Sequence, residues 1–138
     1  MGIRLGILSS LWGRPKLTEL FLNRLEHVKE KFDCVFSSHV IEHCSNPCVY
    51  FENVKRSLKS KGLMIIDTPD ASLCHRKNVQ FKHYNTRNPF EHCCMISFLT
   101  IKFLCKKYGF SIVDYISQPI YQSFCVVLRK DDDNAFST

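Results

Sequence analysis

The sequence predicts a single α/β domain, residues 1–130, built on a mixed sheet of about five strands with an antiparallel pair at its C-terminal end. Short apolar runs recur along the 138 residues and alternate with segments of helical spacing, a pattern typical of strands joined by right-handed helical crossovers. The last two runs, 111–116 and 124–128, are separated only by a short segment around Gln118-Pro119 and therefore form an antiparallel pair. With 45% hydrophobic and 23% charged residues, the composition is that of a globular domain.

The N-terminal part of the chain contains two strands and the helix between them. Residues 3–9 form a short apolar run, and the turn 12–15 ends in a proline that suits the first turn of a helix. Residues 32–36 form a second run, short enough for a buried strand. We expect strands 3–9 and 32–36 to pair in parallel, because such connections are right-handed and an apolar sheet edge needs cover. The helix rests on apolar residues at helical spacing: Leu17, Leu20, Phe21, Leu25 and Val28.

The next helix is expected from Pro47 to Lys61. Ser45 or Asn46 can cap its first turn, and proline is favoured at the first helical position. We expect Gly62 to end it, after a basic turn that suits the negative end of the helix dipole.

The remaining elements follow from similar signals. Residues 63–66 form a third buried strand, which the segment 67–70 breaks. Residues 71–96 show no clear periodicity, and a loop of that length in a small domain is usually functional or disordered. Ser97 caps a last helix, and Gly109 ends it.

Charge and cysteine content restrict the setting in which the protein works. The net charge is +6, but the basic residues are divided between the solvated faces of two helices, so we expect neither a nucleic-acid nor a membrane partner. None of the eight cysteines forms a CxxC pair. We expect Cys34, Cys105 and Cys125, which lie in apolar runs, to be buried and unpaired. With no signal-peptide, myristoylation or membrane-spanning pattern, we expect a reducing, cytoplasmic compartment, and a disordered tail at 131–138.

Several motifs occur in a characteristic order between residues 32 and 130. Residues 32–43 read FDCVFSSHVIEH, residues 58–69 read LKSKGLMIIDTP, and the FEH of residues 90–92 precedes Ser97 and the helix that ends at Gly109. The ordered set resembles the C-terminal half of the class I S-adenosylmethionine-dependent methyltransferases, particularly those of ubiquinone biosynthesis and of sugar and polysaccharide gene clusters.

The resemblance implies a truncated Rossmann-like fold and an ancestral methyl transfer from S-adenosylmethionine to an oxygen or nitrogen of a small molecule or sugar. Because ligands of open α/β sheets bind outside the carboxyl ends of the strands, we expect any cofactor pocket at the ends of strands 32–36 and 63–67, lined by Ser37, Ser38, His39 and Glu42. We expect His92, beside Glu91, to be the catalytic general base, because an ordinary histidine pKa suits proton removal from a hydroxyl; an anchoring role for the pair is an equal alternative.

The sequence departs from the family where the cofactor would bind. It has five glycines, at positions 2, 6, 13, 62 and 109, and no glycine-rich turn after its first strand. About 30 residues precede strand 32–36, too few for three strands with crossovers of 10–12 residues each. We therefore expect the first half of the fold to be absent and catalysis to be weak or lost.

Other interpretations stay open beside this one. A non-catalytic binding or scaffold module, as a homo-oligomer or bound to a complete methyltransferase, is one. A glycosyltransferase-linked fragment is another, because residues 7–15 resemble the opening of family 2-type glycosyltransferases. Some ubiquinone-type methyltransferases carry a metal-assisting cluster in this loop, and Glu42 and His43 match its pattern. His39 stands where a second glutamate is expected. We favour a hydrogen-bonded turn at these residues and assign no metal ligand. Residues 39–43 match H-x-x-E-H, but that protease motif needs a helix and here it follows directly on a strand, so we regard the match as chance. The spacing of His43, Cys44, Cys48, His92, Cys93 and Cys94 gives little support to a zinc site.

Overall fold

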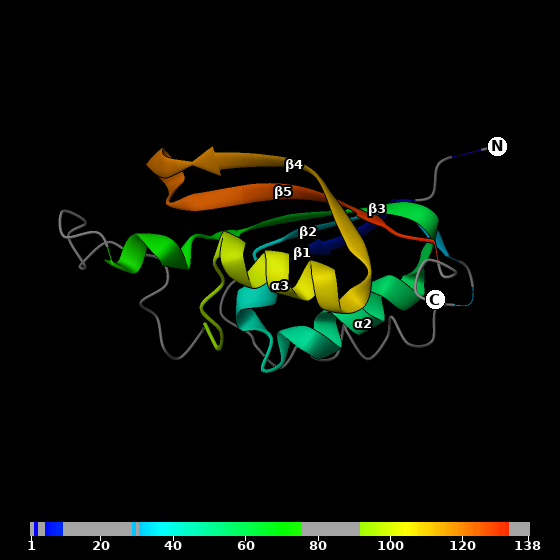
Figure 1. Ribbon diagram of the computed structural model, residues 1–138, viewed down its shortest axis with the longest axis horizontal. Coiled ribbons are helices and arrows are strands. Elements are labelled where there is room, and N and C mark those ends of the chain that lie inside the picture. Colours follow the sequence, from blue (N-terminus) through cyan, green and yellow to red (C-terminus); the bar gives the residue numbers. More distant parts are fainter. Residues whose placement is uncertain (1, 3–4, 10–28, 30, 76–91, 133–138) are drawn as a thin grey trace.

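Five strands form one mixed sheet in the part of the chain that the structure, a computed structural model, describes: residues 2, 5–9, 29, 31–75 and 92–132. The strand order is β1-β2-β3-β5-β4, and β1, β2 and β3 are parallel while β5 is antiparallel to both of its neighbours. Two helices, α2 (Pro47–Ser57) and α3 (Phe98–Tyr108), lie on one face of this sheet (Figure 1). The strands are β1 (Leu5–Ser9), β2 (Phe32–Ser38), β3 (Leu58–Pro69), β4 (Phe110–Gln118) and β5 (Ser123–Lys130).

The N-terminal strand takes the position predicted for it. Strand β1 pairs in parallel with β2, from Leu5 opposite Cys34 to Ser9 opposite Ser38. The parallel pairing is thereby confirmed for residues 5–9. Residues 3 and 4, and the helix expected over residues 15–28, lie outside the described residues.

Helix α2 begins as predicted but ends earlier. The Asn46 side chain accepts a hydrogen bond of 2.9 Å from the Cys48 N–H, and Pro47 follows the cap. The helix ends at Ser57, not at Gly62, because Leu58 turns extended and leads directly into β3. Gly62 has a different role: a Cβ there would lie 3.0 Å from the Lys59 carbonyl oxygen, so the residue permits a close backbone approach.

Strand β3 is longer at both ends than the apolar run 63–66. Asp67, Thr68 and Pro69, which we expected to break the strand, pair with Cys125, Phe124 and Ser123 of β5. The pairing with β5 satisfies backbone groups that a turn would otherwise satisfy. Proline is tolerated at the last position of the strand because only one ladder hydrogen bond is lost there.

The last helix and the C-terminal hairpin confirm the predictions made for them. Ser97 and Thr100 form a reciprocal capping box at the start of α3, and Gly109 ends the helix with a left-handed φ of 73°. Strands β4 and β5 are antiparallel, with a short 3-10 turn, Pro119–Tyr121, between them.

The core lies between the sheet and the two helices. Tyr50 and Phe51 of α2 are completely buried, and Phe51 packs edge-on against Phe110 of β4 with ring centroids 5.7 Å apart. Each such side chain contributes about 1.5–3 kcal/mol through burial. The other large buried core residues include Val35, Leu58, Met64, Ile66, Ile101, Leu104, Phe124, Val126 and Leu128.

The cysteine prediction is correct in part. Cys105 is buried against this core, and burial raises the pKa of its thiol to about 11. Cys34 and Cys125 are only half-buried, because strand alternation directs them to the sheet face opposite the helices. The structure shows seven free thiols, those of Cys34, Cys44, Cys48, Cys93, Cys94, Cys105 and Cys125.

The start of the expected tail is held against the domain. Asp131 N–H donates to the Gly109 carbonyl at 3.0 Å, and Ser60 Oγ donates to Asp132 at 2.6 Å. The prediction of disorder from residue 131 is therefore wrong for these two aspartates, and residues 133–138 lie outside the described range. Among the described residues, no helix is long and apolar enough to cross a membrane.

Candidate functional site

The carboxyl ends of the three parallel strands meet at one edge of the sheet. Ser9 of β1 is opposite Ser38 of β2, and Ser38 is opposite Asp67 of β3. In open α/β sheets, ligands bind outside this edge. The polar residues that follow β2 and end β3 are therefore the candidate site.

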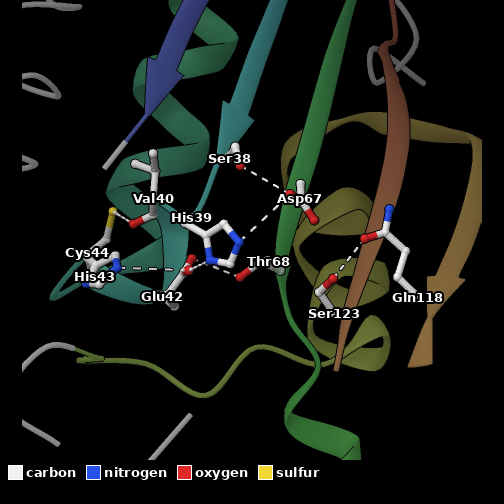
Figure 2. Close-up of polar contacts among 10 residues, drawn as sticks. All are labelled: Ser38, His39, Val40, Glu42, His43, Cys44, Asp67, Thr68, Gln118 and Ser123. Carbon is white, nitrogen blue, oxygen red and sulfur yellow. Dashed lines mark hydrogen bonds and ion pairs between the residues drawn. The ribbon is translucent and has the colours of Figure 1, made fainter. Parts of the chain in front are cut away.

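The end of β2 is tied to β3 by three residues. The His39 N–H donates to the Asp67 carbonyl at 2.9 Å, and Ser38 Oγ donates to the Asp67 carboxylate at 3.1 Å (Figure 2). His39 has a φ of 52°, in the left-handed region that residues other than glycine seldom adopt. That conformation turns the chain off the strand and leads it into the 3-10 helix η1, Ile41–His43.

Glu42 is a buried carboxylate at the centre of this group, with 2% of its surface exposed. One oxygen lies 3.1 Å from His39 Nδ1, and the other accepts a hydrogen bond of 2.9 Å from Thr68 Oγ1 (Figure 2). Burial of a charged group is costly unless it is hydrogen-bonded or paired. The sequence meets that requirement by placing Thr68 next to the end of β3 and His39 one 3-10 turn before Glu42.

The imidazole of His39 lies between two carboxylates. Its Nδ1 faces Glu42, and its Nε2 lies 3.9 Å from Asp67 Oδ2. The hydrogen bond with Glu42 raises the pKa of His39, partial burial opposes this rise, and the charges of Glu42 and Asp67 add to it. When it is protonated, the imidazole therefore links the ends of β2 and β3 through Glu42 and Asp67.

His92 is brought to the other side of Glu42. Its ring lies edge-on to that of His43, with centroids 4.9 Å apart, and the Cys94 N–H donates to the Glu42 carbonyl at 3.0 Å. Side-chain ligand atoms of Glu42, His43 and His92 all lie within 4.8 Å of one another. Two imidazoles and a carboxylate are a donor set that suits zinc or another first-row divalent cation.

The structure brings most of the predicted site residues together. Ser38, His39 and Glu42 share one hydrogen-bonded group, with His92 close by. Ser37 differs: it is completely buried on the helix-covered side. Its side chain therefore faces the core and not the ligand edge. Glu91 lies outside the described residues.

Two functional partners were missed by sequence reasoning. Asp67 and Thr68 supply the carboxylate beside His39 and the hydroxyl that holds Glu42. Their position directly after an apolar strand was the available signal, but we interpreted it only as the end of that strand.

The thiols near the site have other contacts. Cys44 Sγ donates to the Val40 carbonyl at 3.3 Å, and Cys94 Sγ donates to the Cys44 carbonyl at 3.0 Å. Cys48 Sγ lies 3.7 Å from Lys107 Nζ. The only group of possible metal ligands in the described part of the chain contains no cysteine.

The fold and this edge define the class of protein. A family model described as a methyltransferase domain matches residues 12–115. The match covers more than half of the chain, which therefore belongs to the methyltransferase-domain family. It begins within the segment whose resemblance to glycosyltransferases stays a prediction. No curated protein matches the sequence.

Solved structures show the same fold. The N-methyltransferase NodS from Bradyrhizobium japonicum aligns with a TM-score of 0.58 and 10% identity over 95% of this chain and 88% of its own. Magnesium protoporphyrin IX methyltransferase (ChlM) from Synechocystis, with bound SAM, aligns with a TM-score of 0.51 and 14% identity over 78% of this chain and 43% of its own. A chain in a Haloferax volcanii complex that contains the Trm112 methyltransferase activator aligns with a TM-score of 0.62 and 12% identity over 95% of this chain and 74% of its own. At these identities the similarity establishes a Rossmann-like methyltransferase fold.

Proposed function

We propose that this chain is a methyltransferase-like protein whose methyl transfer from S-adenosylmethionine to a small-molecule or sugar oxygen or nitrogen is weak or lost. The observation that carries the proposal is the sequence of the segment after β1. The strand occupies the position beside β2, yet the segment that follows it, Ser10 to Pro15, contains a single glycine. A glycine-rich turn at this point is what lets backbone approach a nucleotide cofactor closely.

The residues at the edge do not fit the complete cofactor. They offer a carboxylate, an imidazole and a hydroxyl from Asp67, His39 and Ser38, and these groups are already bonded to one another or to Glu42. In the family, the glycine-rich turn and a ribose-binding carboxylate make two or more charge-assisted contacts with the cofactor. We propose that this chain lacks these contacts, each of which contributes about 1.5–3 kcal/mol. Their loss weakens binding by roughly two to four orders of magnitude, so that a micromolar site becomes millimolar or weaker.

Calorimetric titration of the chain with S-adenosylmethionine and with its demethylated product tests the proposal. We expect no saturable binding at micromolar ligand. Saturable micromolar binding by a monodisperse sample would overturn it. Titration with sugar nucleotides in the same buffer tests the glycosyltransferase alternative. That alternative is supported if the chain binds a sugar nucleotide but not S-adenosylmethionine.

The assignment of His92, with Glu91, as the general base for any remaining transfer stays a prediction. The contact of His92 with His43 supports its place near the acceptor side of the edge. If a slow methyl transfer is measured, His92→Gln should lower kcat. It should also remove the acidic limb of the pH profile of kcat, because that limb reports protonation of the general base. We also retain a cytoplasmic location as part of the proposal.

A second candidate function is the binding of a divalent cation by Glu42, His43 and His92. The observation that favours it is the convergence of three ligand atoms within 4.8 Å around a buried carboxylate. Co²⁺ titration followed by visible absorption tests it: we expect a d–d band that His92→Ala abolishes. His39→Gln is the matched control, because it removes a histidine on Glu42 that is outside the donor set. Loss of the band in His39→Gln alone would contradict this assignment.

A further inference from the structure

Helices α2 and α3 form one layer on a single face of the sheet (Figure 1). The two helices are in contact: the ring centroids of Phe51 and Tyr108 lie 6.0 Å apart, and Lys107 Nζ lies 3.7 Å from Cys48 Sγ. Their inner sides are buried against the sheet, so their outer sides make up one surface. We call it the outer helix surface; its charged and large apolar residues are Val49, Glu52, Lys55, Arg56, Leu99, Lys102, Phe103, Lys106 and Lys107.

The outer helix surface is strongly basic. Helix α3 carries three lysines and no acidic residue, and α2 carries one lysine and one arginine against a single acidic residue, Glu52. Five basic residues against one acidic residue give the two helices a net charge of +4, out of +6 for the whole chain. The expectation of no membrane partner rests on the separation of these basic clusters along the sequence, and the fold removes that separation.

The other seven acidic residues in the described part of the chain leave this charge in place. Four of them are buried or lie in other parts of the molecule: Glu42, Asp67, Asp70 and Asp114. Three lie near the start of the parallel strands and have partners there: Asp33 with Lys59, Asp131 with Ser111 and Asp132 with Lys61. Glu52 is therefore the only acidic group that the described residues place on the outer helix surface.

Large apolar side chains are exposed among these basic residues. Leu99 and Phe103 are 71% and 64% exposed, and because they are four residues apart they form one row along α3. Lys102 and Lys106 have the same spacing and form a second row beside it. Val49, which is 40% exposed, adds an apolar side chain on α2. Exposed apolar side chains between flexible cations are typical of helices that lie at a membrane interface.

An anionic bilayer surface matches both features at once. At such a surface, apolar side chains enter the boundary between headgroups and acyl chains, while lysine stems lie beside them and the ammonium groups reach the phosphates. A nucleic-acid backbone offers no apolar counterpart to Leu99 and Phe103. A folded acidic protein would have to place a carboxylate opposite each flexible lysine, whereas a lipid surface supplies negative charge without a fixed register. From these observations we propose that the outer helix surface binds the surface of an anionic phospholipid bilayer.

Flotation of the full chain with lipid vesicles tests the proposal without any assay of methyl transfer. The chain should bind phosphatidylcholine vesicles that contain phosphatidylserine and should not bind vesicles of phosphatidylcholine alone. Binding should weaken as the salt concentration rises from about 0.1 M to about 1 M, because the Debye length falls from about 10 Å to about 3 Å. Phe103→Ser removes an exposed apolar side chain and should weaken binding about tenfold. Lys106→Gln should weaken it about fivefold, which is the contribution of one lysine near such a surface.

Matched controls lie on the opposite face of the sheet. Ile116→Ser removes an apolar side chain that is 51% exposed there, and Arg129→Gln removes an exposed charge; both variants should bind as the wild type does. All four substituted positions are exposed, so the circular dichroism spectrum should be unchanged in every variant. Absence of binding to the anionic vesicles overturns the proposal, as does equal binding to both kinds of vesicle. Vesicle binding that Phe103→Ser and Lys106→Gln leave unchanged overturns it too, and so does binding to duplex DNA or polyglutamate without binding to vesicles.

Discussion

Replacement of Thr68 by valine isolates the interaction that holds the buried carboxylate of the site. Thr68 is completely buried, and its hydroxyl donates to Glu42 Oε2 at 2.9 Å. Valine keeps the shape of threonine but has no donor, so one oxygen of a carboxylate that is 2% exposed loses its partner. A hydrogen bond to a charged group contributes about 1.5–3 kcal/mol. For a chain of this length we expect a lower free energy of unfolding by that amount and a Tm lower by about 5–10 °C.

Urea denaturation of the wild type, Thr68→Val and Thr68→Ser at neutral pH tests this expectation. Serine keeps the donor and removes one buried methyl group, for a loss of about 1 kcal/mol. The reasoning requires valine to be more destabilising than serine although it fills the site better. A valine variant as stable as the wild type, or more stable than the serine variant, would refute the role assigned to this hydrogen bond.

Two further perturbations follow from the same structure. Because Glu42 raises the pKa of His39, the ion pair between them contributes its full stability below the ordinary histidine pKa of 6.5, and this contribution is lost as pH rises through the raised pKa. His39→Gln should therefore lower the free energy of unfolding more near pH 5.5 than near pH 8.5. With its side chain 40% exposed, His39 should account for no more than about 1 kcal/mol, and an equal loss at both pH values in paired urea titrations would contradict the ion pair. Gly62→Ala should destabilise by about 1–3 kcal/mol, since its Cβ would lie 3.0 Å from the Lys59 carbonyl oxygen. Gly2→Ala, with open space around it, is the control in the same melting experiment.

Elements whose boundaries depend on local chemistry were predictable from the sequence. Ser97 accepts a backbone N–H at the start of α3 and Gly109 takes the left-handed conformation at its end, as their residue types indicate. The parallel pairing of β1 with β2 followed from the handedness of strand–helix–strand units. None of these predictions required knowledge of distant contacts.

Elements whose boundaries depend on pairing with distant strands were not predictable. Gly62 and the basic residues before it form a convincing helix end, yet Leu58 already enters β3, where it is opposite Phe32. Lys59 then forms an ion pair with Asp33 at 2.8 Å. Likewise, Asp67 to Pro69 extend β3 because β5 lies beside them. Tertiary pairing overrides local propensity in both places.

The arrangement of the candidate site residues was predictable only in part, and their function stays a prediction. Ser38, His39 and Glu42 were identified because polar residues directly after a buried strand lie at the ligand edge. Ser37 was expected to line the pocket because it is small and lets backbone approach a ligand, and that role stays a prediction; the two-residue period of a strand places its side chain with Val35 on the helix-covered face. The role of Thr68 required knowing that η1 turns Glu42 beneath the end of β3, which the sequence does not specify.

The character of the strands also bears on the sheet face opposite α2 and α3. A sheet with one face in water usually alternates apolar and polar residues, whereas strands covered on both faces are apolar throughout. Leu63 to Ile66 is a continuous apolar run, and Phe36 and Val127 add apolar residues on the same side of the neighbouring strands. The strands therefore have the composition of a sheet buried on both faces, while α2 and α3 cover one.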